Sequence, residues 1–350
     1  FGGWNHDGSR IAFAANREDA SRFDIYVQKL GEKARRTYAG PGGYFNPIVW
    51  SPDGSTILIQ RVESNVKHDL YLHFPDAEGG NMRKLTPDKE EAQYESPTWS
   101  WDSKTIVCAS TAGGRDLTAL AAVDVATGKL TYLDTPPHAI EVAHSSPNSP
   151  ALVYLVNEDG RSAMKLRDLK PSRTEPVAGF PPGVIGTLEF AQDGLQLALS
   201  FDGPRNNGDI WLWDAATMKP RQLTHSGRAG LPFNEFIQPE SVKFKSFDGR
   251  EIPAWWYPAK PASGSGPVIV YPHGGPESQT RPNFSALFQY FLARGYSILA
   301  PNVRGSSGYG TKFMNLDNIE KRMDSVADLA HAAHWIRDQK KGDPKRVAVY

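Results

Sequence analysis

The residue types best suited to chemistry lie in a glycine-rich loop that follows an apolar run. Residues Val268–Tyr271 lead into His273, Gly274, Gly275 and Pro276. A continuous apolar run rich in β-branched residues predicts a strand buried on both faces of a parallel sheet. The glycines let the backbone turn with positive φ or approach a ligand closely. Because the carboxyl ends of strands in open α/β sheets line a crevice, this loop is predicted to border a ligand site.

A second glycine-rich loop carries the next candidate. Residues 303–310 read Val-Arg-Gly-Ser-Ser-Gly-Tyr-Gly and follow an apolar run at 296–300. At the end of a sheet strand, Arg304 could face a substrate or tie loops together through carboxylates. The segment from Gly305 to Gly308 lacks the Gly-x-Ser-x-Gly spacing of a nucleophile elbow, and no apolar helix follows it at once. It is predicted to be a tight loop.

Acidic and histidine residues farther along give weaker signals. Asp324 and Asp328 are four residues apart, which fits an acid pair but is more typical of helix-start electrostatics and loop anchoring. His331 and His334 are predicted to be surface or packing residues. The histidines show no H-x-x-x-H or carboxylate cluster with metal spacing, and no phosphate-binding glycine loop opens a helix. We therefore expect no metal and no cofactor.

The elements that would position these residues alternate between strands and helices after residue 238. Two helices are expected from apolar residues at helical spacing. The first stripe comprises Phe284, Leu287, Phe288, Phe291 and Leu292, and the second comprises Val326, Leu329, Ala330, Ala333 and Ile336. Strand, helix, strand, helix and strand at this spacing predict an α/β fold with a mostly parallel, doubly wound sheet.

The chain before residue 238 repeats a different pattern. An aromatic residue, a turn centred on Asp-Gly or its equivalent, and an apolar run recur with starts 46, 49, 46 and 45 residues apart. The copies begin at Trp4, Trp50, Trp99 and Phe190, and a degenerate copy begins at Ser145. Four short antiparallel strands in a repeat of about 45 residues are typical of a β-propeller blade. We expect at least five blades here and further blades upstream of Phe1, seven or eight in full, because a propeller must close.

Length and composition agree with two domains, which we place at residues 1–237 and 238–350. The 39 basic residues balance the 39 acidic ones, so charge indicates neither nucleic acid nor an anionic membrane as a partner. The single cysteine, Cys108, excludes an intrachain disulfide and is predicted to be buried. No apolar run approaches the roughly 18 residues of a membrane span. We favour a cytoplasmic protein but leave a periplasmic or secreted one open, since we expect the N-terminus to be missing.

The His273–Pro276 loop, the segment at 301–310 and the helix with Asp324 and Asp328 resemble the catalytic domain of the prolyl oligopeptidase family. The acylaminoacyl-peptidase and dipeptidyl-peptidase branches are the most similar. In this family a β-propeller precedes an α/β-hydrolase domain, and the Trp-Ser-Pro-Asp-Gly repeats resemble that propeller. The resemblance covers essentially the whole chain. It implies a serine peptidase that hydrolyses short peptides through an acyl-enzyme, with the propeller restricting access.

Alternatives to a peptidase are an esterase or other acyl hydrolase on the same fold, and a non-catalytic propeller binding protein. The oligomeric state is open, a homo-oligomer included. No Gly-x-Ser-x-Gly occurs within residues 1–350, so the resemblance implies that the catalytic Ser, Asp and His all follow Tyr350. On this interpretation the chain is cut at both ends.

Inside the chain, the resemblance implies half of an oxyanion hole. Gly275 is the expected backbone N–H donor, and Gly274 would allow the tight turn. His273 either donates from its ring or shapes the loop. It is not expected to be the catalytic base, because the family places that histidine last in the chain.

Overall fold

The computed structural model describes residues 2–40, 44–77, 80–169, 172–260, 266–275 and 277–350. Pro276 of the first glycine-rich loop lies outside the described residues. The chain divides into two compact units. One unit comprises Phe1–Leu155, Met164–Pro176 and Phe190–Leu195, and the other comprises Val156–Ala163, Val177–Glu189 and Gln196–Tyr350. The domain boundary between residues 237 and 238 stays a prediction.

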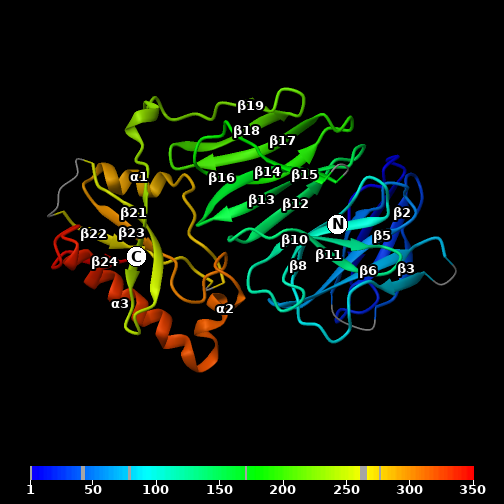
Figure 1. The fold of residues 1–350 in the computed structure, drawn as a ribbon, viewed down its shortest axis with the longest axis horizontal. Coiled ribbons are helices and arrows are strands. Elements are labelled where there is room, and N and C mark those ends of the chain that lie inside the picture. Colours follow the sequence, from blue (N-terminus) through cyan, green and yellow to red (C-terminus); the bar gives the residue numbers. More distant parts are fainter. Residues whose placement is uncertain (1, 41–43, 78–79, 170–171, 261–265, 276) are drawn as a thin grey trace. The chain divides into compact units, whose positions relative to one another are not determined.

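Five antiparallel sheets, each made of strands consecutive in sequence, account for the described strands before residue 223 (Figure 1). The first sheet has three strands and an isolated antiparallel bridge from Trp4 to Ile11, and the other four sheets have four strands each. In order, the sheets are β1 (Arg10–Ala15), β2 (Asp24–Lys29), β3 (Arg35–Tyr38); β4 (Phe45–Trp50), β5 (Ile57–Ser64), β6 (Lys67–Phe74), β7 (Asn81–Lys84); β8 (Tyr94–Trp99), β9 (Thr105–Ser110), β10 (Ala119–Asp124), β11 (Leu130–Asp134); β12 (Ile140–Ser145), β13 (Ala151–Glu158), β14 (Arg161–Leu169), β15 (Ser172–Pro176); and β16 (Val184–Phe190), β17 (Gln196–Gly203), β18 (Asn206–Asp214), β19 (Lys219–Gln222). These sheets are propeller blades, one for each sequence repeat, which confirms the predicted architecture.

The Asp-Gly motif or its Asp-Ser variant forms the first hairpin turn in four of the five blades, because its aspartate caps the turn. In four repeats this carboxylate accepts a hydrogen bond from the backbone N–H two residues later. The following Gly8, Gly54 and Gly194 each take φ of 70°, in the left-handed region. Ser103 takes φ of 57° in the copy that has no glycine. The turn geometry is therefore kept even where the sequence motif is degenerate.

Adjacent blades of the first unit share their apolar cores. Ile25 of the first blade packs in one cluster with Trp50 of the second, and Leu70 of the second blade packs in another with Trp99 of the third. Both tryptophans begin sequence repeats, which explains why the aromatic position recurs. Cys108 is fully buried in the second cluster, and burial raises the pKa of its thiol to about 12. Its predicted burial is confirmed, and the thiol stays protonated and inert.

The chain after residue 238 forms a five-stranded mixed sheet in the order β20-β21-β23-β22-β24. Strands β22, β23 and β24 are parallel to one another, while β21 is antiparallel to both β20 and β23. The strands are β20 (Glu240–Lys245), β21 (Glu251–Tyr257), β22 (Val268–Val270), β23 (Ser297–Pro301) and β24 (Val347–Val349). The helices are η1 (Phe233–Glu235), α1 (Ala286–Ala293), α2 (Thr311–Met314), η2 (Asn315–Asp317), η3 (Ile319–Lys321) and α3 (Arg322–Asp338). No helix among the described residues is long and apolar enough to span a membrane.

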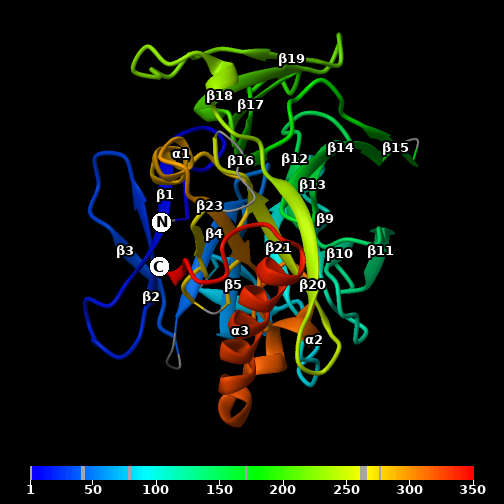
Figure 2. The ribbon, with the colours of Figure 1, turned by 90° about the vertical axis from the view of Figure 1, so that its left-hand side faces the viewer.

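Strand β22 is buried on both faces, as its apolar run predicts. Val268 and Val270 pack in one cluster with Ile336 of α3, whereas Ile269 packs in another with Leu292 of α1. Because side chains alternate along a strand, the two helices cover opposite faces of the sheet (Figures 1 and 2). All three β22 residues are at most 6% exposed.

The buried face of α3 differs from the predicted apolar stripe. The buried residues are Ser325, Asp328, Ala332 and Ile336, whereas Val326 is 49% exposed. The prediction was right for Leu329 and Ile336, which pack in the core, and wrong for Val326 and Ala330, which are exposed. It also missed the burial of Asp328, because an apolar pattern assigns a charged residue to solvent. Asp328 instead faces the protein interior, where its carboxylate pairs with Arg304.

The turn geometry gives a test of the blade motif. Replacing Gly54 by Ala puts a Cβ at φ of 70°, where no atom other than Asn5 Nδ2, at 3.9 Å, would contact it. The cost is therefore backbone strain, and we expect a loss of about 1 kcal/mol in the free energy of unfolding. Urea denaturation followed by tryptophan fluorescence measures it. The control is Gly227→Ala, which adds a methyl group in open space outside the left-handed region and should be neutral. Equal losses in the free energy of unfolding for Gly54→Ala and Gly227→Ala would contradict the role of a positive φ at Gly54.

Candidate active site

Three parallel strands end at one edge of the sheet, and the candidate residues follow two of them. Strand β22 leads into His273–Gly275, and β23 leads into the loop from Asn302 to Gly310. After β24, the Tyr350 N–H donates to the Val270 carbonyl at 3.1 Å. Because the carboxyl ends of parallel strands meet at the same edge, the sheet brings together both glycine-rich loops that the sequence singles out.

Gly275 is the position of the first loop that requires glycine. Its φ is 138°, and a Cβ would lie 2.9 Å from the Glu277 nitrogen and 3.4 Å from the Ser278 Cβ. At Gly274 the φ lies outside the left-handed region, and a Cβ would meet nothing within 4 Å. The turn therefore depends on Gly275, which corrects the expectation that Gly274 allows it. Both residues are exposed at the strand end.

The His273 ring fastens the first loop to the second. Its Nε2 lies 2.8 Å from the Ser306 Oγ, and the Ser306 hydroxyl donates to the Val303 carbonyl at 2.6 Å. The ring Nδ1 also lies 3.0 Å from the Gly274 carbonyl, so the direction of the Ser306 contact depends on which ring nitrogen carries the proton. Ser306 is fully buried, so it is no exposed nucleophile, and its segment is the tight loop that its spacing predicts. The ring contact favours the loop-shaping role of His273, which stays a prediction.

Asn302 makes a second connection between the loops. This fully buried side chain accepts from the Thr280 N–H at 2.6 Å and donates to the Thr280 carbonyl at 3.1 Å and the Tyr309 hydroxyl at 2.8 Å. The Ser307 N–H also donates to the Ser278 carbonyl at 2.9 Å. Burial raises the pKa of Tyr309 to about 12, so its hydroxyl stays protonated. Asn302 was missed in the sequence, although a polar residue directly after a buried strand was the available signal.

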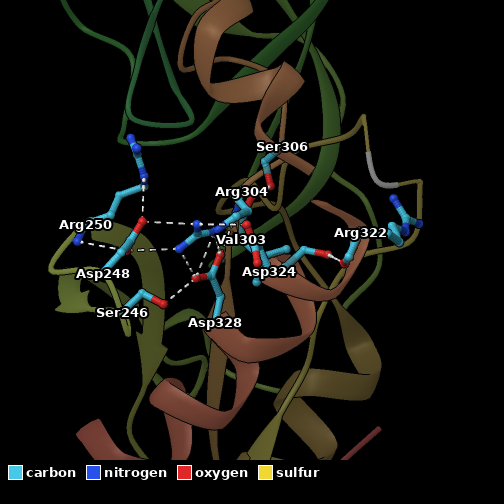
Figure 3. Close-up of polar contacts among 10 residues, drawn as sticks. Ser246, Asp248, Arg250, Val303, Arg304, Ser306, Arg322, Asp324 and Asp328 are labelled. Carbon is cyan, nitrogen blue, oxygen red and sulfur yellow. Dashed lines mark hydrogen bonds and ion pairs between the residues drawn. The ribbon is translucent and has the colours of Figure 1, made fainter. Parts of the chain in front are cut away.

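Arg304 forms a buried ion-pair cluster at the start of the second loop (Figure 3). Its side chain is 3% exposed, and its Nη2 lies 2.9 Å from the Asp328 Oδ1. Its Nη1 and Nη2 each donate to the Asp248 carboxylate at 3.2 Å. The Ser246 hydroxyl donates to Asp328 at 2.5 Å, and the Arg304 backbone N–H donates to Asp328 at 3.0 Å. One aspartate on α3 thus holds both the main chain and the side chain of the loop.

The electrostatics of this cluster favour the charged forms of Arg304 and Asp248. Burial acts to lower the pKa of Arg304, but the hydrogen bonds and charges of Asp328 and Asp248 outweigh it and raise that pKa. Burial likewise acts to raise the pKa of Asp248, but the hydrogen bonds from Arg304 and the Arg250 backbone lower it. Because the guanidinium of Arg304 donates to two carboxylates, its role in this structure is to hold the loop in place. These contacts favour the alternative that Arg304 ties loops together, while its place beside the substrate stays a prediction.

The remaining candidates have structural roles. Asp328 is a loop anchor, while Asp324, 41% exposed in its side chain, lies 3.8 Å from Arg304. The two are therefore no acid pair. The rings of His331 and His334 pack edge to face with centroids 5.1 Å apart. Within the described residues no group of three or more His, Cys, Asp or Glu side chains could hold a metal ion.

The contacts of Arg304 predict very different losses of stability when either of two aspartates one helical turn apart is replaced. In Asp328→Asn, Arg304 keeps its buried charge without its main partner, so we expect a loss of about 3–5 kcal/mol in the free energy of unfolding. The matched control is Asp324→Asn. Because the ion pair between Asp324 and Arg304 is long and partly exposed, we expect its loss to lower the free energy of unfolding by less than about 1 kcal/mol. Urea unfolding of both variants measures the difference. Similar losses would show that Arg304 does not depend on Asp328.

Known proteins resemble this chain over nearly its whole length. An uncharacterized peptidase of Bacillus subtilis (strain 168) is 23% identical over 462 residues, covering 99% of this chain and 68% of that protein. The dipeptidyl aminopeptidase BIII of Pseudoxanthomonas mexicana is 24% identical over 355 residues, covering 98% of this chain and 51% of the enzyme. The crystal structure of puromycin hydrolase matches the fold with a TM-score of 0.85 at 20% identity, covering 98% of this chain and 56% of that one.

The part of the chain that follows the first glycine-rich loop matches a family model. Residues 282–350, which include the Arg304 loop, α3 and β24, match the model of the prolyl oligopeptidase family. The chain spans between about half and two thirds of the length of the relatives named above. The C-terminal part of the chain is thus similar to the prolyl oligopeptidase family, and nearly the whole chain is similar to two peptidases at 23% and 24% identity.

Proposed function

We propose that the chain supplies the propeller and half of the oxyanion hole of a serine peptidase. The observation that supports this most directly is the position of Gly275, exposed in a strained turn where β22 ends beside β24. Acyl transfer needs N–H donors aimed at the oxyanion that forms when the carbonyl carbon is attacked. In α/β-hydrolases one donor comes from the residue after the nucleophile and the other from a loop at a neighbouring strand end. The Gly275 N–H would be the second donor.

The nucleophile would belong to residues that follow Tyr350 in a longer protein. A nucleophile elbow follows a buried strand, and β24 is the parallel neighbour of β22 with Tyr350 directly after it. An elbow there would present its serine at the edge where Gly275 lies. The Asp and His of the triad would follow later in the chain. Within this geometry the peptide carbonyl would sit between the elbow and the Gly275 loop.

The substrates we propose are short peptides, cleaved as acylaminoacyl, dipeptidyl or oligopeptide substrates, with the propeller restricting access. The relatives include a dipeptidyl aminopeptidase and a puromycin hydrolase. Parallel assays of the full-length protein on acyl-peptide, dipeptidyl and simple ester substrates would separate a peptidase from an esterase. Digestion of a folded protein as fast as a pentapeptide would contradict the access filter. Hydrolysis of none of these substrates would favour a non-catalytic binding protein.

Two neighbouring glycines provide a matched test of the proposed donor. Gly275→Ala forces a Cβ against the Glu277 nitrogen and turns the N–H, so we expect kcat to fall about 100-fold with KM little changed. Gly274→Ala adds the same methyl group into open space, so we expect a loss about 10-fold smaller. Steady-state kinetics of the full-length protein on a chromogenic dipeptide measure both. Equal losses of kcat in the two variants, or a rise in KM with kcat unchanged in Gly275→Ala, would contradict the role of Gly275.

A further inference from the structure

The segment that follows the candidate oxyanion loop is held by two propeller blades. Residues 279–284 connect the Gly275 loop to α1, and they belong to the same compact unit as the β13–β14 turn and most of the last blade. Their backbone and side chains bond to both. The segment is therefore fixed from the propeller side, while Asn302 and Ser278–Ser307 fix its first residues from the side of the second glycine-rich loop.

Asn157, near the end of β13 and beside the β13–β14 turn, makes the first of these contacts. Its Oδ1 accepts from the Gly160 N–H at 2.6 Å and so closes the turn, while its Nδ2 donates to the Gln279 Oε1 at 2.7 Å. The side chain is 1% exposed. A buried amide that bonds on both sides has a fixed orientation, because turning it would leave buried polar atoms unpaired.

Arg281 makes the second contact, with the same turn. Its Nε donates to the Gly160 carbonyl at 2.8 Å, and its Nη2 donates to the Ser162 hydroxyl at 3.0 Å. The turn approaches closely, since a Cβ on Gly160 would lie 3.6 Å from the Arg281 Cα. The Arg161 guanidinium lies over the Trp255 ring of β21, 4.9 Å from its centroid. The turn thus contacts both the loop segment and the sheet that carries it.

Asp202, at the end of β17, makes the third contact. Its carboxylate accepts from the Phe284 N–H at 2.8 Å, directly before the N-cap residue of α1. Farther along α1, the Gln289 side chain donates to the Pro204 carbonyl and to the Ile237 carbonyl, each at 3.2 Å. The start of α1 is therefore positioned by the last blade, at the other end of the segment from Asn157.

From these contacts we infer that the β13–β14 turn positions the loop that carries the candidate oxyanion donor, Gly275. Asn157 and Arg281 are positioning residues that set where the Gly275 N–H points. This inference rests on the proposed function and adds a role for the propeller that differs from restricting access. An access filter acts on large substrates, whereas a positioning contact acts on every substrate, because each forms the same oxyanion.

The test uses the full-length protein with Arg281→Met, Arg281→Lys and Asn157→Ala. Arg281→Met and Asn157→Ala should lower kcat about 10- to 100-fold on a small chromogenic ester with KM little changed, because a donor displaced by a fraction of an ångström stabilises the oxyanion poorly. Arg281→Lys keeps one donor and should recover part of the loss. The control Arg167→Met removes hydrogen bonds of 2.8 and 2.7 Å to Thr174 and Ser172 within the fourth blade and should leave kcat unchanged.

A thionoester substrate separates positioning from general destabilisation. Sulfur is a poor hydrogen-bond acceptor, so the wild type should prefer the oxo-ester, and Arg281→Met should reduce that preference by lowering only the oxo-ester rate. Equal losses on both substrates, or an equal loss in Arg167→Met, would overturn the inference.

Hydrogen exchange distinguishes failure of this inference from failure of the proposed function. Amides of residues 273–285 should exchange faster in Arg281→Met than in wild type and Arg167→Met, whether or not the protein hydrolyses any substrate. A wild type that hydrolyses neither peptides nor esters would refute the proposed function alone. Unchanged exchange in Arg281→Met would refute the positioning role by itself.

Discussion

The parallel pairing of β22 with β23 on one side and β24 on the other is the constraint on which the site depends. It places three strand ends at one edge, so that the Gly275 loop, the Arg304 loop and Tyr350 meet there. The pairing is stabilised by burial on both faces, since α1 covers Ile269 and α3 covers Val268 and Val270. Any loss of this register would move all three ends relative to one another, and the site would lose its geometry.

The loops above that edge are ordered by polar groups that have no access to solvent. Asn302 and Ser306 are fully buried, and Arg304 is nearly so. Each would destabilise the fold if left unpaired, and each has a partner outside its own loop. These partners are Thr280 for Asn302, His273 for Ser306 and Asp328 for Arg304. The same logic holds for Asn157, whose buried amide joins the β13–β14 turn to Gln279. The site is thus held by interactions that are costly to break, as a preorganised oxyanion hole requires.

The sequence predicted those parts of the structure that depend on local patterns. The aromatic and Asp-Gly repeats indicated the blades because each turn is capped within a few residues, as by Asp53 and Gly54. The apolar run at β22 likewise predicted that this strand is buried on both faces. The burial of Asp328 in α3 was not predictable from local pattern, because it depends on Arg304, 24 residues earlier. Gly274 and Gly275 look alike in the sequence, and they differ in the folded chain by the φ of Gly275 and by its closeness to Glu277 and Ser278.

A structure of the full-length protein with a peptide boronate on its nucleophile would test most directly whether the Gly275 N–H binds the oxyanion. The tetrahedral adduct carries an oxygen where the oxyanion forms. If the Gly275 N–H binds the oxyanion, we expect this oxygen at about 2.7–3.1 Å from the Gly275 nitrogen. An adduct whose oxygen points away from the Gly275 loop, with its donors supplied by other residues, would contradict the account.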